Sequence, residues 1–418
     1  MSKWQWLLSQ LTRKLWFRAC LFAVLAVLSA LISIVLKPYI PPHIGGIVGA
    51  DAVDNILNIL ASSMLAVTTF SLSIMVSAFG AASTSVTPRA TRLVIEDRTT
   101  QNVLATFIGS FLFSLVGIIA RSMGAYGEQG RVVLFIVTLI VIGLIIITLL
   151  AWIQHLSLLG RVGETTSRVE LVTRLSLETR VKVPYMGANP WPAEAQPPIN
   201  AIAVYPDEIG YVQNIDLHSL NAYAESINGA LYLHCQAGAF VHTAQPIIWL
   251  TSSEGEIDSA EVLSNIIISA ERSFDQDPRF GFSVLAEIAS RALSPAVNDP
   301  GTAIDVIGRA VRLLALWEEK TEEPERLYPR CYVRPIKTAD LFDDIFNPIA
   351  RDGAALVEVQ LRLLKALQAL NKINRAAFAA DTRRYISLIA QLSETAMVSP
   401  QDKAKISSWV KQYVLHDE

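Results

Sequence analysis

Four long stretches without a charged residue constrain this chain more than any other feature. They cover residues 19–36, 56–80, 101–120 and 132–154. At a rise of about 1.5 Å per residue, a helix of such length crosses a hydrocarbon core roughly 30 Å thick, with the first stretch near the lower limit. We therefore expect a transmembrane domain of four helices in residues 1–155.

The basic residues that flank these stretches predict their orientation. Such residues gather before the first stretch and after the second, and they are sparse on the other side. The rich side has Lys3, Arg13, Lys14, Arg18, Arg89, Arg92 and Arg98, and the poor side has Lys37, Arg121 and Arg131. No small-residue cleavage site follows the first stretch, so we expect a retained span and not a signal peptide. Both termini are expected in the cytoplasm.

The composition indicates that a soluble part follows the membrane domain. The 418 residues are 52% hydrophobic and 17% charged, and their mean hydropathy is +0.38, which is too apolar for a soluble protein and too charged for a membrane domain alone. A net charge of -3, without basic runs that interleave aromatic residues, argues against a nucleic-acid partner. Cys20, Cys235 and Cys331 are far apart and match no zinc pattern, so we expect reduced, buried thiols.

The soluble part divides into four segments by its pattern. Residues 156–183 predict an amphipathic stalk helix that continues the last span, and residues 184–199, with five prolines, predict a linker. Short β-branched and aromatic runs predict a small antiparallel β-subdomain in residues 200–255, with one short helix in DLHSLNAYAESI. Apolar periodic runs predict helices throughout residues 256–418. The expected fold class is a membrane domain followed by an α+β cytoplasmic domain.

The helical segment contains a distinctive joint, RALSPAVNDPGTA. We expect Ser294 to end one helix because it precedes Pro295, and Asp299 to cap the next helix with Pro300 in its first turn. Asn298 completes a tight joint between them. The helices of this segment are expected around VLSNIIISA with Asp258 as cap, at 281–293, 300–319, from 338, at 352–373, 375–396, and from 400 with Ser399 as cap.

The second span is unusually rich in hydroxyl groups. On a helical projection its small residues gather on one broad face, and these are Ser62, Ala66, Thr69, Ser73, Ser77, Gly80 and Thr84. Such a face either lets helices approach closely or lines a wet path for an ion or small solute. We favour packing, because Ser71 lies on the opposite side, and the wet path stays open as the alternative. No span carries an ionisable residue in its central part, which disfavours a proton-coupled pump.

Motifs that carry a known chemistry are absent from the sequence. We find no phosphate-binding GxxxxGK[ST], no GxGxxG after a strand, no HExxH and no GxSxG. A metal site or an acid/base pair could draw on Asp275, Asp277, Asp299 and Asp305, but their spacing favours caps and turns. The spacing of His218, His234 and His242 fits no compact metal site. We therefore expect no enzyme, no cofactor and no metal.

A resemblance to a known family is carried mainly by two stretches, and GYVQNID and GAFVHTAQPI resemble the β section of the same family. Bacterial predicted membrane proteins catalogued as domain of unknown function 2254 closely resemble FDQDPRFGFSVLAEIASRALSPAVNDPGTAIDVI (residues 274–307) and STSVTPRATRLVIEDRTTQNVLATFIGSF (residues 83–111). The family usually has an aromatic residue and a serine where this chain has Val86 and Thr87, so the resemblance assigns these two positions no role. It implies the architecture above and an inner-membrane location, and it brings no catalytic residue. Its signature loop includes Asp275, Asp277, Ser294, Pro295, Asn298, Asp299 and Pro300.

Together these features predict an oligomeric inner-membrane protein. Its four-helix domain is expected to form a conduit for ions or small solutes, and its cytoplasmic domain to assemble or gate that conduit. The expected partners are the lipid bilayer, further copies of the chain, and an ion or small solute. Two alternatives stay open: a non-conducting, membrane-anchored scaffold that binds a ligand or protein, and an enzyme with a site around residues 274–305.

Overall fold

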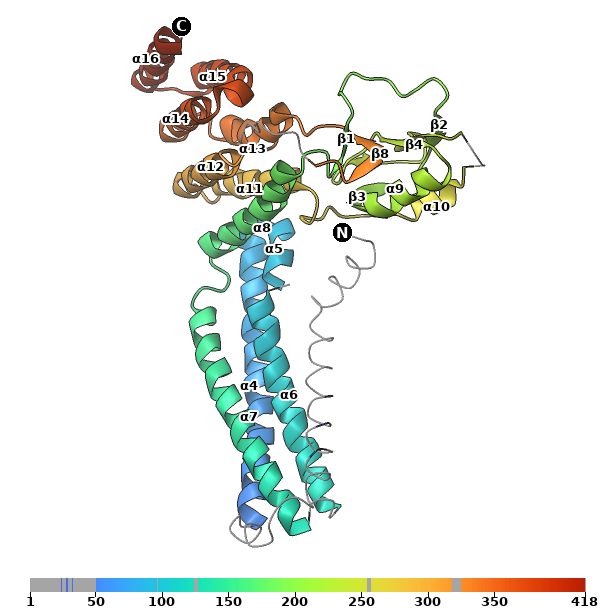
Figure 1. Ribbon diagram of the computed structural model, residues 1–418. Coiled ribbons are helices and arrows are strands. Elements are labelled where there is room, and N and C mark those ends of the chain that lie inside the picture. Colours follow the sequence, from blue (N-terminus) through green and yellow to red (C-terminus); the bar gives the residue numbers. More distant parts are fainter. Residues whose placement is uncertain are drawn as a thin grey trace. The chain divides into compact units, whose positions relative to one another are not determined.

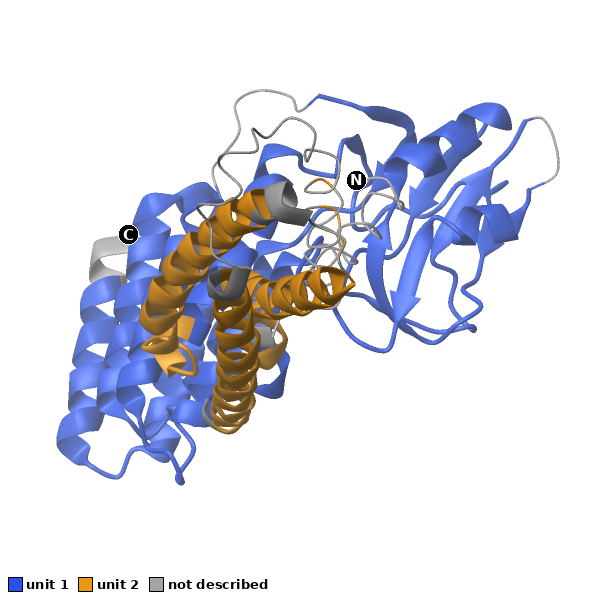
Figure 2. Cartoon of the chain, turned by 90° about the horizontal axis from the view of Figure 1, so that it is seen from below, with its two compact units in different colours: residues 1–6, 85–90, 165–418 blue, residues 7–84, 91–164 orange. Residues whose placement is uncertain are grey.

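The computed structural model describes residues 50–95, 97–123, 127–253, 257–317 and 325–417, together with residues 24, 28 and 32. Apart from these last three residues, the first expected span lies outside the described residues. The chain forms two compact units, coloured in Figure 2. We call the described residues 50–84 and 91–164 the apolar unit, and residues 85–90 and 165–417 the α/β unit.

Three long helices form the apolar unit as far as it is described (Figure 1). They are α4 (Ala50–Ser85), α6 (Arg98–Ser122) and α7 (Gly127–Leu156), and the short α5 (Pro88–Ile95) lies between the first two in the sequence. Length and composition allow three of their segments to cross a membrane, and these segments are Val53–Ala81, Thr99–Ser122 and Val132–Leu156. They coincide with the second, third and fourth expected spans.

Pairs of ionisable side chains lie at both ends of this unit, and its interior is mainly apolar with a few buried hydroxyls such as those of Ser114 and Thr138. Asp54 pairs with Arg121 at one end. At the other end Asp97 accepts hydrogen bonds from the backbone N–H and hydroxyl of Thr100, at 2.8 Å each, and lies 2.9 Å from Nε2 of His155. Between the two pairs α4, α6 and α7 pack through the buried side chains of Val53, Leu57, Leu60, Met64, Val103, Phe107, Phe113, Leu134, Ile145 and Trp152.

The stalk helix does not continue the last span, contrary to the sequence-based expectation. Helix α7 ends at Leu156, residues 157–160 form a turn, and α8 (Val162–Lys182) begins beyond it. Gly160 adopts a φ of +80° in this turn, a left-handed conformation that glycine adopts without steric cost. The continuous apolar pattern therefore concealed a break that one backbone conformation produces.

A five-stranded sheet opens the β part of the α/β unit. Its strand order is β1-β8-β4-β6-β2, and β2, β6 and β4 pair antiparallel, as expected. Two strands correct the prediction: β1, at one edge, lies inside the expected proline-rich linker, and β8 comes from the segment expected to be helical and pairs parallel with both β1 and β4. The strands are β1 (Ala188–Pro190), β2 (Ile202–Val204), β4 (Ala230–Leu233), β6 (Ile248–Thr251) and β8 (Tyr328–Val333).

A second sheet, of order β5-β3-β7, completes the β part. It contains β3 (Gly210–Ile215), β5 (Phe240–Val241) and β7 (Ile266–Ser269), with α9 (Leu217–Ser226) and α10 (Ser259–Leu263). The stretch VLSNIIISA, expected to be helical, instead ends α10 and enters β7. Its isoleucines are β-branched and pair antiparallel with β3, which is the environment that such residues favour. Asp258 caps α10 as expected.

Six helices follow in the described part of the C-terminal segment, at the places where the sequence predicts them. They are α11 (Pro278–Ala292), α12 (Pro300–Leu314), α13 (Thr338–Asp352), α14 (Val357–Ile373), α15 (Arg375–Ala396) and α16 (Pro400–Asp417). The aromatic rings of Phe342, Phe346, Phe378 and Tyr385 form part of their core. Ser399 accepts from the backbone N–H of Asp402 at 3.3 Å, in agreement with its expected role as cap.

Candidate functional site

The signature loop begins with a buried carboxylate at the first turn of α11. Asp277 is only 2% exposed, and it accepts hydrogen bonds from the backbone N–H of Phe280 at 3.1 Å and from Nε of Arg272 at 2.8 Å. Burial raises the pKa of this carboxyl, and the positive charge of Arg272 opposes that effect. A Cβ atom on Gly238 would overlap the Asp277 carboxylate, so the carboxylate fills a space that only glycine leaves.

A second buried ionisable group lies beside this turn. The guanidinium of Arg180, at the end of α8, donates from Nη2 to the backbone oxygen of Gln276 at 3.4 Å. Burial lowers its pKa to about 10, and the negative charge of Asp277 counteracts the effect. Arg180 therefore stays protonated at neutral pH and brings a positive charge into the contact between α8 and the start of α11.

An arginine of the same motif connects α11 to α13. Arg279 donates from Nε to Asp344 at 2.7 Å and from Nη1 to Asp340 at 3.0 Å. The charges of both partners raise its pKa, although burial opposes them. This fork of charge-assisted hydrogen bonds orients α11 against α13.

The joint between α11 and α12 has the geometry that the sequence predicts. Helix α11 ends at Ala292. The backbone oxygen of Ala292 accepts a hydrogen bond from the backbone N–H of Asp299 at 2.8 Å. Asn298 adopts a φ of +50°, which asparagine tolerates better than most residues. Asp299 caps α12 by accepting from the backbone N–H of Thr302 at 3.1 Å. The hydroxyl of Ser294 donates to the backbone oxygen of Arg291 at 2.6 Å, which closes the end of α11.

The structure does not gather the signature carboxylates into one site. Asp277 lies at the start of α11 and Asp299 lies beyond its end, and the 15 residues of that helix span about 22 Å at its normal rise. Asp275 accepts instead from the hydroxyl of Ser273 at 3.1 Å, and Asp305 pairs with Arg309 on its own helix. Across the described ranges no three histidine, cysteine, aspartate or glutamate side chains form a group that could hold a metal.

Helix α8 is fastened to both signature helices. The carboxylate of Glu170 accepts from Arg309 at 2.6 Å and from Arg312 at 2.8 Å, both on α12. Burial alone would raise the pKa of Glu170, but the hydrogen bond from Arg312 and the charges of both arginines hold it below its usual value. Close packing against α11 depends on Gly281, because a Cβ atom there would overlap the hydroxyl of Thr173 on α8.

The hydroxyl-rich face of α4 points away from the other described helices of its unit. Ser62, Thr69, Ser73 and Ser77 are all exposed, whereas Ser71 on the opposite side is 1% exposed. Ser62 and Thr69 donate to backbone oxygens of the preceding turn, at 2.9 and 2.8 Å. Their donors are thereby satisfied within the helix, and the oxygen lone pairs remain on the outer face.

Helix α7 exposes a face of a different kind. Its exposed side chains are long and aliphatic, as suits contact with lipid tails, and they include Ile136, Leu139, Ile140, Leu144, Ile146, Ile147, Leu150 and Ile153. Helix α4 exposes large apolar side chains as well, among them Leu65, Phe70 and Val76, so the two helices differ in the hydroxyls that α4 adds and not in a lack of apolar groups. The sequence placed the four hydroxyls on one face, and the structure adds that this face is open.

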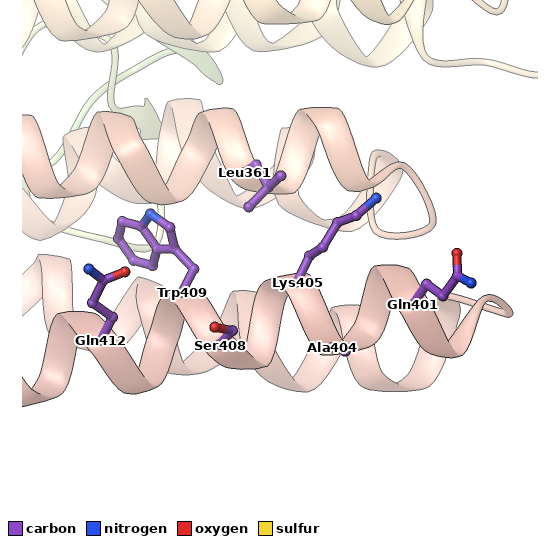
Figure 3. A pocket seen from close by; sticks show the side chains of 7 residues that line it. All are labelled: Leu361, Gln401, Ala404, Lys405, Ser408, Trp409 and Gln412. Carbon is purple, nitrogen blue, oxygen red and sulfur yellow. The ribbon is translucent and has the colours of Figure 1, made fainter.

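A shallow groove of about 450 Å³ runs between α14 and α16. Figure 3 shows Leu361 of α14 facing Trp409 and Lys405 of α16 across it, with Ser408 and Gln412 at its rim. Trp409 stacks on Tyr413 at a ring distance of 5.5 Å. The sequence analysis did not single out this groove. Of its polar lining residues, Lys405 pairs with Asp402 on the same helix at 2.9 Å.

The contacts that organise the signature helices were not predicted either. The partners of Glu170, Arg279 and Glu287 lie 139, 65 and 200 residues away in the sequence. No local spacing marks such pairs. The only sequence signal is that these charged residues lie on helices with many apolar positions, which indicates that they have charged partners.

Comparisons with known proteins agree with the architecture. A family model described as "Predicted membrane protein (DUF2254)" matches residues 12–369, which confirms the resemblance found in the sequence. An uncharacterised protein of Mycobacterium tuberculosis (strain CDC 1551 / Oshkosh) is 25% identical over 264 residues, covering 60% of this chain and 50% of the relative, and one from Mycobacterium bovis shows the same identity and coverage. The chain thus spans about half the length of the curated relatives it matches. No solved structure matches the chain.

Proposed function

The chain belongs to the family of predicted membrane proteins catalogued as domain of unknown function 2254, and from that premise we propose that it forms an oligomeric conduit for ions or small solutes. In this proposal α4 lines the path or the contact between copies, and the α/β unit assembles or gates the membrane helices. The protein acts without a catalytic step. It resides in the bacterial inner membrane with both termini in the cytoplasm.

The observation that carries the proposal is the open face of α4. A lipid-facing helix normally exposes aliphatic side chains, as α7 does, because a hydroxyl gains nothing from hydrocarbon. Helix α4 also exposes apolar side chains such as Leu65 and Val76, but Ser62, Thr69, Ser73 and Ser77 add small oxygen-bearing groups to its outer face over four turns. Such a face suits water in a path or a closely packed helix of another copy.

The distribution of charge agrees with a passive path. In the described spans the ionisable residues lie near the ends, in the pairs Asp54–Arg121 and Asp97–His155. The central turns of α4 carry no group that could relay a proton or couple transport to a second ion. Movement along this face would therefore follow the solute's own gradient.

The test combines labelling with flux. In a Cys20→Ala background, Ser62→Cys, Thr69→Cys, Ser73→Cys and Ser77→Cys variants are reconstituted in liposomes and exposed to a charged, membrane-impermeant thiol reagent. Ile140→Cys and Ile147→Cys on α7, which are 66% and 69% exposed, serve as lipid-facing controls. We expect the α4 positions to react and the α7 positions to remain unreacted. Potassium and chloride flux from the loaded liposomes should fall once the α4 cysteines are labelled.

Three outcomes separate the alternatives. Labelling together with label-sensitive flux supports the conduit. Disulfide-linked dimers through the α4 cysteines, without labelling or flux, would replace it with a non-conducting scaffold whose copies pack through α4. No labelling, no cross-linking and no flux would refute both a wet path and a contact between copies at this face.

A further inference from the structure

Residues 85–90, from the last residue of α4 through the first turn of α5, belong to the α/β unit. The chain enters that unit at residue 85 and leaves it after residue 90. Within it Val86 and Ala90 are fully buried and Thr87 is 5% exposed. The C-terminal end of α4 therefore continues directly into a buried segment that belongs to the α/β unit.

A glutamate of the signature helix holds this segment. Glu287 on α11 accepts a hydrogen bond from the hydroxyl of Thr87 at 2.9 Å through one carboxylate oxygen, and its other oxygen pairs with Nη1 of Arg89. The hydroxyl of Thr87 also lies 3.4 Å from the backbone nitrogen of Arg89. One carboxylate thus engages two side chains of the segment, an arrangement with more geometric specificity than a single surface ion pair.

The other connection to the apolar unit is held by the next helix of the signature. Helix α8 follows α7 after one turn, and its Glu170 is fastened to Arg309 and Arg312 of α12. The two contacts therefore lie on opposite sides of the joint 293–299: Glu287 of α11 binds the chain that leaves α4, and Arg309 and Arg312 of α12 bind α8, which also packs on α11 at Gly281.

The joint makes α11 and α12 a stiff pair. Asp299 closes it with a backbone hydrogen bond to Ala292 and caps α12. The facing sides of both helices are buried, with exposures of 2% or less at Val284, Ile288, Ala303, Val306 and Ile307. Close-packed helices of this kind move as one body and do not deform gradually.

We propose that the α11–joint–α12 hairpin couples the two chain connections, so that a change at the α8–Glu170 contact alters the hold of Glu287 on residues 85–90. The carboxylates of Glu170 and Glu287 form the two contacts through which the hairpin binds these connections. One part of this inference rests on the proposed function: that the coupling controls α4, the helix that carries the hydroxyl face. The coupling itself is a property of the α/β unit and can be measured without any flux.

The experiment is hydrogen exchange on the full chain in lipid nanodiscs. Four variants are compared with the wild type: Glu287→Gln, Glu170→Gln, their double variant, and Glu178→Gln as control. Glu178 pairs with Arg174 on the outer side of α8, where their side chains are 31% and 57% exposed, so its loss tests for a general effect of removing charge from that helix. The reporting amides are those of Arg89 and Ala90, the second of which donates to the backbone oxygen of Thr87.

Loss of the Glu287 charge is expected to speed exchange of these amides by roughly tenfold, as befits a charge-assisted hydrogen bond. The coupling predicts that Glu170→Gln, although it touches none of residues 85–90, speeds the same amides by roughly threefold or more. It also predicts that the exchange rate in the double variant rises by less than the product of the increases in the two single variants. In return, Glu287→Gln should speed the exchange of amides in α8. Glu178→Gln should leave residues 85–90 unchanged.

Unchanged exchange at residues 85–90 in Glu170→Gln, or strictly multiplicative effects in the double variant, would overturn the coupling. Unchanged exchange at residues 85–90 in Glu287→Gln would show that the contact of Glu287 with Thr87 and Arg89 does not stabilise this segment. If Glu170→Gln also loosens the distant core of α15, Arg312→Gln replaces it, because that variant leaves Arg309 on Glu170. If Glu170→Gln speeds exchange at residues 85–90 but liposomes show no flux, the proposed conduit is refuted and the coupling is supported. If liposomes show flux but Glu170→Gln leaves this exchange unchanged, the conduit is supported and the coupling is refuted.

Discussion

Gly281→Ala tests how closely the membrane-proximal helix α8 packs on the signature. A Cβ atom at this position of α11 would overlap the hydroxyl oxygen of Thr173 and lie 2.6 Å from its Cβ and Cγ2 atoms. Thr173 is 1% exposed, and its hydroxyl already donates to the backbone oxygen of Val169 at 2.6 Å. A rotation of this side chain would break that hydrogen bond inside a buried contact, so we expect the two helices to move apart instead.

The expected change in the free energy of unfolding is the difference between two opposing contributions. Overfilling a well-packed contact costs about 1–3 kcal/mol, and three overlapping atoms on a fixed side chain place Gly281→Ala near the upper end. Alanine gains roughly 1 kcal/mol over glycine inside a helix. The net loss is then about 2 kcal/mol, which corresponds to a melting temperature lower by roughly 4–8 °C for a unit of this size.

The assay is thermal unfolding of the full chain in detergent, followed by intrinsic fluorescence. Gly308→Ala is the matched control, because it lies in the neighbouring helix α12 and nothing lies within 4 Å of its added Cβ. The control should melt at or slightly above the wild-type temperature, since only the helix-propensity gain applies. Thr173→Ala combined with Gly281→Ala should recover part of the loss. A Gly281→Ala protein as stable as the control would refute the close contact of α8 with α11.

Three further measurements test separate parts of the α/β unit. Asp299→Ala should lower the stability by about 1 kcal/mol through loss of the α12 cap, whereas Asp299→Asn should retain most of it, as thermal unfolding would reveal. Glu170 has a folded-state pKa below its ordinary 4.5, so its contribution is present above that value and disappears as the pH falls through the folded value; the melting temperature of Glu170→Gln should therefore depend less on pH between 5 and 3 than that of the wild type. Burial raises the pKa of Cys235 and Cys331 to about 12 each, so a Cys20→Ala protein should take up maleimide at pH 8 only after denaturation, and rapid labelling in the folded state would contradict their burial.

Elements whose signals are local were predictable. Hydropathy over about twenty residues located the second, third and fourth spans, because crossing a membrane depends on the composition of one segment. The caps Asp258, Asp299 and Ser399 were also found, since a capping side chain bonds to its own first turn. The break at Gly160 was missed, because the apolar pattern continues on both sides of it and only the backbone conformation interrupts the helix.

Elements whose partners are remote were not predictable. Strand β8 joins the sheet between β1 and β4, although residues 270–327 separate it from β7, and a six-residue run of its composition does not show which strands it will join. The isoleucines of β7 form a strand because β3 offers them a pairing edge. The cap Asp258 suggested a helix there, although the β-branched isoleucines that follow favour a strand.

The same division applies to the candidate site. The sequence by itself determined that Ser62, Thr69, Ser73 and Ser77 share one helix face, because a period of 3.6 residues leaves no other arrangement. It also determined that the signature contains a joint, because proline and a capping aspartate act on their immediate neighbours. Only the tertiary structure decided that the hydroxyl face is open, that the signature aspartates lie far apart, and that Glu287 holds the segment after α4. Those outcomes depend on which surfaces the folded chain buries against each other, and contacts across as many as 200 residues leave no trace in a local pattern.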